Sequence, residues 1–161
     1  VLVEEEGNFD AYVCSLDDPF NLTSARWYKG KLDPNGNFQG TSTDGVEFQG
    51  KIQGDQFNGT LRNTAQQTFA FSGAAVPAGG KAGLYRGLGK YENEDVIVGT
   101  VLSIDGSFAA TAQYKSALKF VSPVASPPVE LGNNRLGVNI GPSGVQITVE
   151  LVTTLKGQSI F

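Results

Sequence analysis

Between residues 28 and 73 the chain alternates apolar and polar side chains and repeats the motif Phe-x-Gly. The motif begins at Phe38, Phe48 and Phe57. The turn sequence Asp-Pro-Asn-Gly-Asn precedes the first copy, and Thr-Asp-Gly and Gly-Asp separate the copies. Alternation with a period of two between turn signals is typical of antiparallel strands with one buried and one wet face. The pattern therefore predicts a meander of β-hairpins.

The turn chemistry predicts a register for each hairpin of this meander. The first loop sets Leu32, Gly30 and Tyr28 opposite Phe38, Gly40 and Ser42. The later turns give the pairs Phe38–Gly50, Gly40–Phe48, Ile52–Phe57, Phe48–Leu61, Phe57–Gly73, Gly59–Phe71 and Leu61–Phe69. Each phenylalanine of the repeat then covers a glycine, whose bare backbone the ring shields. We expect five rings to point inward, those of Phe38, Phe48, Phe57, Phe69 and Phe71.

The remaining chain reads as further strands joined by turns. Three strands are expected between residues 84 and 116, and a hairpin follows a proline-rich stretch. The pattern predicts an all-β fold of about eleven to thirteen strands, an antiparallel meander that forms a β-sandwich or a strongly coiled, barrel-like sheet. The predicted division is a glycine-rich β-domain at 1–121, a connector at 122–132 and a C-terminal β-hairpin at 133–161.

Composition narrows the function classes. The net charge is −4 and the chain has no histidine. An acidic chain gains little attraction to nucleic acid, and the commonest general base and metal ligand is missing. The acidic pairs Asp17-Asp18 and Glu94-Asp95 fit solvated turns better than a catalytic pair. We therefore predict no enzyme activity, no cofactor, no metal site, no nucleic-acid partner and no membrane span.

One segment carries a family resemblance. The sequence from Gly54 to Phe108, which includes "FAFSGAA" and "GKAGLYRGLGKYENEDVIVGTVLSIDGSF", resembles a glycine-rich β-domain of uncharacterised secreted or lipid-anchored bacterial proteins. The resemblance implies an extracellular or cell-surface location. The absence of methionine, even at position 1, led us to expect a removed leader in preference to a fragment of a longer chain.

Two functional hypotheses from different classes follow. In the first, the chain is a structural or adhesive surface protein, such as a filament or surface-layer subunit, that self-associates by β-strand addition. The apolar face of the last strand would carry the assembly, through Val145, Ile147, Val149 and Leu151. In the second, the chain is a carbohydrate-binding module whose exposed aromatic rings stack on sugars, and the expected glycan contacts are Trp27, Tyr85 and Tyr91. Trp27 is expected on the polar-facing side of its strand, where a neighbouring element or a ligand covers it.

Overall fold

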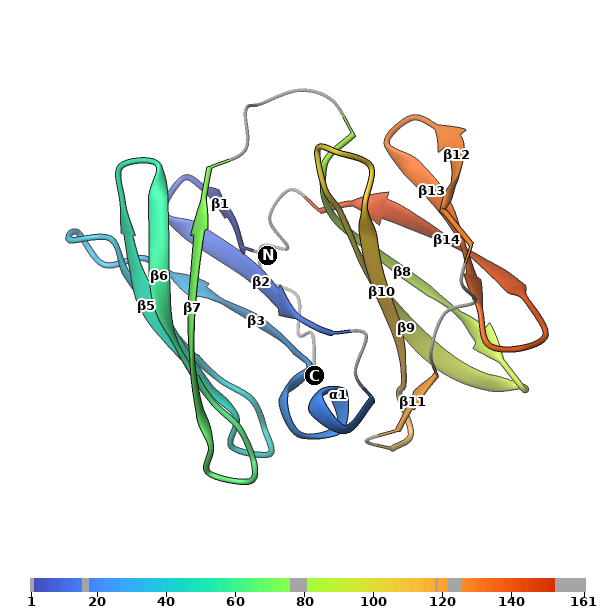
Figure 1. Ribbon diagram of the computed structural model, residues 1–161, viewed down its shortest axis with the longest axis horizontal. Helices are drawn as coiled ribbons and strands as arrows, with labels where there is room; N and C mark the ends of the chain where they lie inside the picture. The colour runs from blue at the N-terminus through green and yellow to red at the C-terminus, as the bar shows by residue number, and fades with distance from the viewer. Residues whose placement is uncertain (1, 16–17, 76–80, 118, 122–125, 153–161) are drawn as a thin grey trace. The chain divides into compact units, whose positions relative to one another are not determined.

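The computed structural model confirms an all-β fold made of antiparallel sheets (Figure 1). It describes residues 2–15, 18–75, 81–117, 119–121 and 126–152. Within these ranges lie fourteen strands, one more than the upper expectation, and the short helix α1 (Asp18–Ser24). Contacts divide the described chain into two units. The first takes its residues from 1–13 and 23–78, and the second from 14–22 and 79–152.

The first unit contains two sheets. One has the order β1 (Leu2–Glu5), β2 (Asn8–Val13), β3 (Arg26–Lys31). The other has the order β4 (Asn37–Thr41), β5 (Glu47–Gln53), β6 (Gln56–Arg62), β7 (Thr68–Ala74). Side chains from both sheets share one core, whose buried members are Phe9, Ala11, Tyr28, Phe38, Val46, Phe48 and Leu61.

The predicted registers of the later three hairpins are confirmed. The ladders contain the pairs Phe38–Gly50, Gly40–Phe48, Ile52–Phe57, Phe48–Leu61, Phe57–Gly73, Gly59–Phe71 and Leu61–Phe69. Gly45 and Gly54 have positive φ angles at the first two of these turns, where glycine has no Cβ to clash. Local turn chemistry therefore determines how β4 to β7 pair.

The first predicted register is wrong, because β3 and β4 belong to different sheets. The turn itself forms, with the Asp33 amide donating to the Asn37 carbonyl at 2.9 Å. Beyond it, the ring of Tyr28 lies over Gly40, 3.2 Å from where a Cβ would stand. The rings of Phe9 and Phe38 also meet, with centroids 5.5 Å apart. β3 and β4 therefore meet through these side chains and their shared turn, and no ladder joins them.

The prediction that all five rings point into the core is wrong for Phe69. Phe38 and Phe48 are buried, and Phe57 and Phe71 are half-buried against the same core. Phe69 is 37% exposed. It lies on β7, the last strand of its sheet, which has only β6 beside it among the described strands.

An ion pair ties β3 to the turn between β4 and β5. Arg26 is buried, and its Nε donates to the two carboxylate oxygens of Asp44 at 3.1 and 3.2 Å, with Nη2 adding a third contact. These hydrogen bonds from Arg26 hold the pKa of Asp44 below its usual value, and the hydroxyl of Ser42 acts in the same direction. The carboxylate of Asp44 thereby neutralises the positive charge of the buried Arg26 guanidinium group, which would be costly to bury without an anion.

We expect Asp44→Asn to lower the free energy of unfolding by about 1 to 3 kcal/mol at neutral pH, because the buried guanidinium loses its anionic partner. Since the folded-state pKa of Asp44 is lowered, its contribution is complete above the ordinary aspartate pKa of about 3.9 and is lost as the pH falls through the folded-state value. Urea melts from about pH 3 to 7 should show a steeper acid loss of stability in the wild type than in the variant. Parallel curves would show that the pair contributes nothing.

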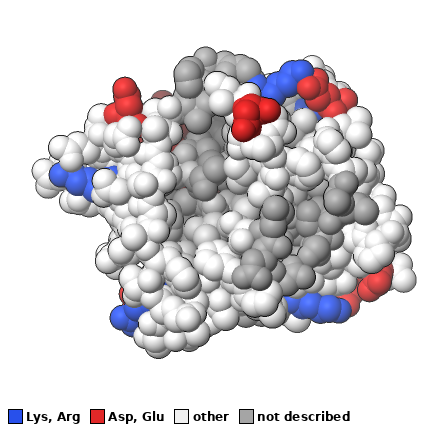
Figure 2. All heavy atoms as spheres, viewed as in Figure 1, with Lys and Arg blue, Asp and Glu red and all other residues white. Residues whose placement is uncertain are grey.

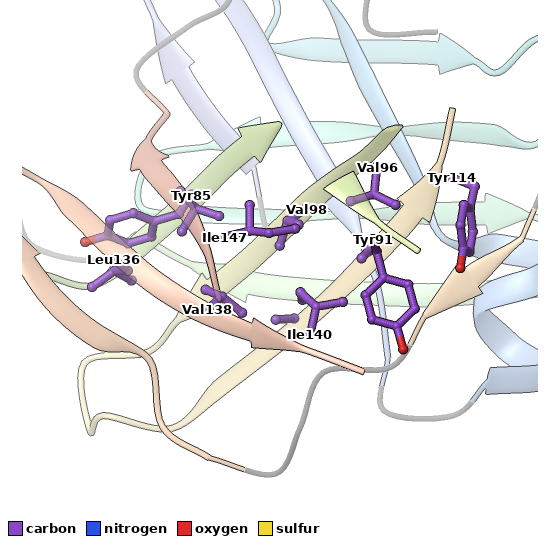
Figure 3. Packing of buried hydrophobic residues seen from close by; sticks show 12 residues of the cluster. Tyr85, Tyr91, Val96, Val98, Tyr114, Leu136, Val138, Ile140 and Ile147 are labelled. Carbon is purple, nitrogen blue, oxygen red and sulfur yellow. The ribbon is translucent and has the colours of Figure 1, made fainter. Parts of the chain in front are cut away.

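The second unit is one seven-stranded sheet. Its order is β11 (Phe120–Val121), β10 (Phe108–Tyr114), β9 (Glu94–Leu102), β8 (Gly83–Tyr91), β14 (Val145–Leu151), β13 (Arg135–Ile140), β12 (Val129–Gly132). The described members of its core all come from strands of this sheet, among them Tyr85, Val98, Val138 and Ile147 (Figure 3). A sheet that encloses its own core must curl, and this curl gives the half-barrel form.

The division by contacts falls at a different place from the predicted one. The predicted C-terminal hairpin pairs with β8, through Glu150–Arg86 and Leu151–Tyr85, inside the second unit. The strand β12 occupies the end of the predicted connector at 122–132. Residues 122–125 of that connector and residues 153–161 of the predicted hairpin lie outside the described residues.

Candidate functional site

The strand predicted to carry assembly, β14, is built into its own sheet. It pairs with β13 from Val145 to Glu150 and with β8 at its end. Ile147 and Val149 are buried in the core of the second unit, Leu151 packs against that core, and Val145 is 37% exposed. The apolar face of β14 thus packs in the core of its own unit. Any exchange of this strand would first have to break its pairing with β13 and β8.

The three aromatic residues predicted to contact glycans are buried. The exposure that the glycan hypothesis needs is wrong for Tyr85 and Tyr91, and Trp27 is covered, which was one of the two expectations for it. Trp27 is 6% exposed and stacks on Tyr12, with ring centroids 4.4 Å apart. Tyr85 and Tyr91 belong to the core of the second unit, and the hydroxyl of Tyr85 donates to the Lys81 carbonyl at 2.6 Å. A sugar-stacking platform needs an accessible ring face, and none of the three rings offers one here.

We expect the fluorescence of Trp27, the single tryptophan, to show the burial directly. Its emission maximum should lie well to the blue of free tryptophan, iodide should quench it weakly, and added oligosaccharides should leave it unchanged. The physical reason is that neither water nor a ligand reaches the stacked indole. A red-shifted emission that moves on addition of an oligosaccharide would restore Trp27 as a glycan contact.

The edge strands of the sheets are the next place to look for a functional surface. An edge strand presents unpaired backbone amides and carbonyls, and natural proteins protect such edges with charges, short length, bulges or a covering element. Five of the six edges of the described sheets are protected or adjoin another edge. β1 carries Glu4 and Glu5, β11 has two residues, and β12 has four with a register shift and Glu130. The edges of β3 and β4 adjoin each other at their shared turn.

The edge of β7 has none of these protections from the residues that the structure describes. The strand is seven residues long, with the sequence Thr-Phe-Ala-Phe-Ser-Gly-Ala, and it contains no charged residue and no proline. It pairs with β6 at every position from Thr68 to Ala74, and no other described strand forms a ladder with it. Figure 2, viewed as Figure 1, shows charged side chains gathered near the margins of this face of the molecule. β7 is therefore the long uncharged edge among the described strands.

A tight turn sets β7 in place. The Asn63 amide donates to the Gln67 carbonyl at 3.0 Å, and the Gln67 amide donates back to the Asn63 side chain at 2.9 Å. Gln66 adopts a positive φ angle of 62° to complete the reversal. Because Asn63 is buried and held by these bonds, the register that follows from the turn is fixed, and the small side chains Ala70 and Ser72 point to the exposed polar face.

The polar face of the four-stranded sheet has a shallow hollow of about 560 Å³. Side chains that line it are mostly amides, hydroxyls and lysines: Lys31, Asn37, Gln39, Gln49, Lys51, Asn58 and Thr60. The carboxylate of Asp33 at its rim accepts hydrogen bonds from the Asn35 and Asn37 amides at 2.8 and 2.9 Å, so it serves the turn. The hollow is the wet side that the alternation of the sequence predicts.

Groups that could support catalysis are scattered in the described chain. Burial raises the pKa of the half-buried Cys14 thiol, which keeps it protonated and poorly nucleophilic at neutral pH. No three acidic or thiol side chains among the described residues come together as a metal site. No helix of the described chain is long and apolar enough to cross a membrane.

Comparisons with known proteins found no match: no family model, no curated protein and no solved structure is significantly similar to this chain. The resemblance of the segment from Gly54 to Phe108 to a glycine-rich β-domain of secreted or lipid-anchored bacterial proteins stays a prediction. Function has to be argued from the surfaces described above.

Proposed function

We propose that this chain is a non-enzymatic structural or adhesive β-protein that associates with further copies of itself by β-strand addition. We place it outside the cell or on the cell surface, as the resemblance to secreted glycine-rich β-domains implies. Strand addition joins two sheets through backbone hydrogen bonds and buries apolar side chains in the same step. A protein that acts in this way needs an accessible, unprotected sheet edge.

The observation that carries the proposal is the edge of β7. Its seven residues carry neither charge nor proline, whereas the other edges of the described sheets are short, charged or adjoin another strand. A long, flat, uncharged edge is a site of pairing with another chain. Phe69, 37% exposed on this edge, adds apolar surface for a partner strand to cover.

The proposal moves the association surface from β14 to β7. Exchange of β14 would remove the buried side chains of Ile147 and Val149 from the core, at a cost of several kcal/mol before any new contact forms. Pairing at β7 needs no such opening, because the strand already lies at the end of its sheet. Association is therefore expected for the folded chain without rearrangement.

We expect the double variant Ala70→Lys/Ser72→Lys to abolish self-association, since lysines on an edge strand block the approach of a second strand. Both positions are exposed on the polar face of β7, so the fold should be retained. Sedimentation velocity of the full chain across a wide concentration range should show association in the wild type and a monomer in the variant.

The control variant is Gln39→Lys/Gln56→Lys, which adds the same two charges at exposed positions of β4 and β6. It should associate as the wild type does. A wild type that stays monomeric at the highest concentration, with no fibres or sheets in negative-stain micrographs, would overturn the proposed function.

A further inference from the structure

Within the four-stranded sheet, aromatic rings lie over glycines of the neighbouring strand. A Cβ built on Gly59 would stand 2.7 Å from the Phe71 ring, and one built on Gly73 would stand 2.3 Å from the Phe57 ring. Gly40 is flanked on both sides, because Phe48 is its ladder partner on β5 and Tyr28 of β3 reaches it from the other side. Tyr28 and Phe48 stack with centroids 4.9 Å apart. Two rings that flank one glycine are thus a packing unit that this fold already uses.

The strand β7 contains half of a second such unit. Gly73 is covered by Phe57 from the β6 side, while its other side faces the edge. Phe69 lies on the same face of the strand, four positions earlier, and is 37% exposed. Phe71 stands midway between the two and at the midpoint of the strand, which runs from Thr68 to Ala74.

We infer that a second copy of this chain pairs antiparallel with β7 about a two-fold axis at Phe71, an inference that rests on the proposed function. This register pairs all seven residues of β7 with all seven of its partner. Phe69 of each copy comes opposite Gly73 of the other, Ala70 comes opposite Ser72, and Phe71 meets its own equivalent. Gly73 then lies between Phe57 of its own sheet and Phe69 of the second copy, as Gly40 lies between Phe48 and Tyr28.

Neighbouring registers fit the strand less well. An axis at Ala70 or at Ser72 leaves residues at the strand ends without a partner, because neither is the midpoint of β7. An axis at Ser72 would set Phe71 opposite Gly73 of the second copy. The Phe71 ring, however, already packs over Gly59, its ladder partner on β6. With the axis at Phe71, the exposed ring of Phe69 packs against the outward-facing side of Gly73 in the second copy.

The pairing joins two four-stranded sheets into one continuous sheet. An interface in which each copy presents the same strand is isologous and closes on itself as a dimer. The edge of β7 alone therefore makes dimers, and a filament requires a second surface on each copy. Mutations at the edge of β7 would affect dimer formation, and mutations at the second surface would affect filament growth without preventing the dimer.

Disulfide cross-linking tests the register, because two cysteines bridge only when their Cα atoms lie about 4.4 to 6.8 Å apart, as directly opposite residues of an antiparallel pair do. Three samples are compared in a Cys14→Ser background, which removes the native thiol: Ala70→Cys alone, Ser72→Cys alone, and an equal mixture of the two. With the axis at Phe71, mild oxidation should cross-link mainly the mixed pair, and each single variant should form several-fold less dimer.

The outcomes separate the inference from the proposed function. Efficient homodimers of Ala70→Cys place the axis at Ala70, and those of Ser72→Cys place it at Ser72; either result overturns the inference. If the wild type associates and Ala70→Lys/Ser72→Lys abolishes the association, but none of the three samples cross-links above the level of an exposed Gln56→Cys control, the strands pair at β7 in another register and only this inference fails. If the wild type does not associate at all, the proposed function fails with it.

Discussion

Replacing Phe48 by alanine is expected to lower the free energy of unfolding by about 3 to 5 kcal/mol, the range for truncation of a fully buried aromatic residue. The Phe48 side chain is 3% exposed. Its ring stacks on Tyr28 and Phe71 with centroids 4.9 Å away in each case, and on Phe38 at 5.2 Å. Removing the ring therefore leaves a cavity between the two sheets of the first unit.

The matched control is Phe69→Ala, the same chemical change on the exposed ring of β7. Measured in urea melts at a concentration where the chain is monomeric, it should cost less than about 1 kcal/mol, because the ring is only partly withdrawn from water. Similar losses for the two variants would contradict the assignment of Phe48 to the core and of Phe69 to the edge.

Replacing Gly59 by alanine is expected to lower the free energy of unfolding by about 3 kcal/mol, at the upper end of what overpacking costs. A Cβ at this position would stand 2.0 Å from the Gln49 carbonyl oxygen and 2.7 Å from the Cα of Gly50. Both are backbone atoms, so β5 and β6 would have to separate where Gly50 and Gly59 oppose each other.

The control for this variant is Asn58→Ala, one position earlier on β6 and exposed on the polar face. It should change stability by no more than about 0.5 kcal/mol, as surface substitutions usually do. If Gly59→Ala is as mild as this control, the close approach of the two backbones, and the role of the Phe-x-Gly repeat in permitting it, are wrong.

Local chemistry explains which parts of the fold could be predicted. The turns between β4 and β7 act over a few residues, so positive φ angles at Gly45 and Gly54 help to determine a register that can be read from the sequence. The pairing of β3 with β2 in place of β4 could not be read in this way. It depends on how the rings of Phe9, Tyr28 and Phe38 pack together in the core between the two sheets. These residues come from different strands, so a local sequence pattern does not reveal their packing.

The candidate site was missed for a related reason. The segment from Thr68 to Ala74 was correctly expected to be a strand, but whether a strand ends a sheet depends on where the next strand goes. The next strand, β8, pairs with β9 and β14 in the seven-stranded sheet of the second unit. Among the described strands, β7 therefore pairs on one side only. Burial of Trp27, Tyr85 and Tyr91 was likewise outside the reach of strand alternation. Alternation buries every second residue, whereas Trp27 and its neighbour Tyr28 are both buried, as are Tyr85 and its neighbour Leu84. The uncharged composition of β7 was the available signal.

Amide hydrogen exchange as a function of protein concentration tests the association at β7 most directly. In a dilute sample the outward-facing amides of residues 68–74 should exchange fast, since no described strand pairs with that side. As the concentration rises through the association range, these amides should become protected, while the amides of β1 and β12 should keep their rates. Protection of residues 68–74 that does not change with concentration, in a chain shown to associate, would contradict the account.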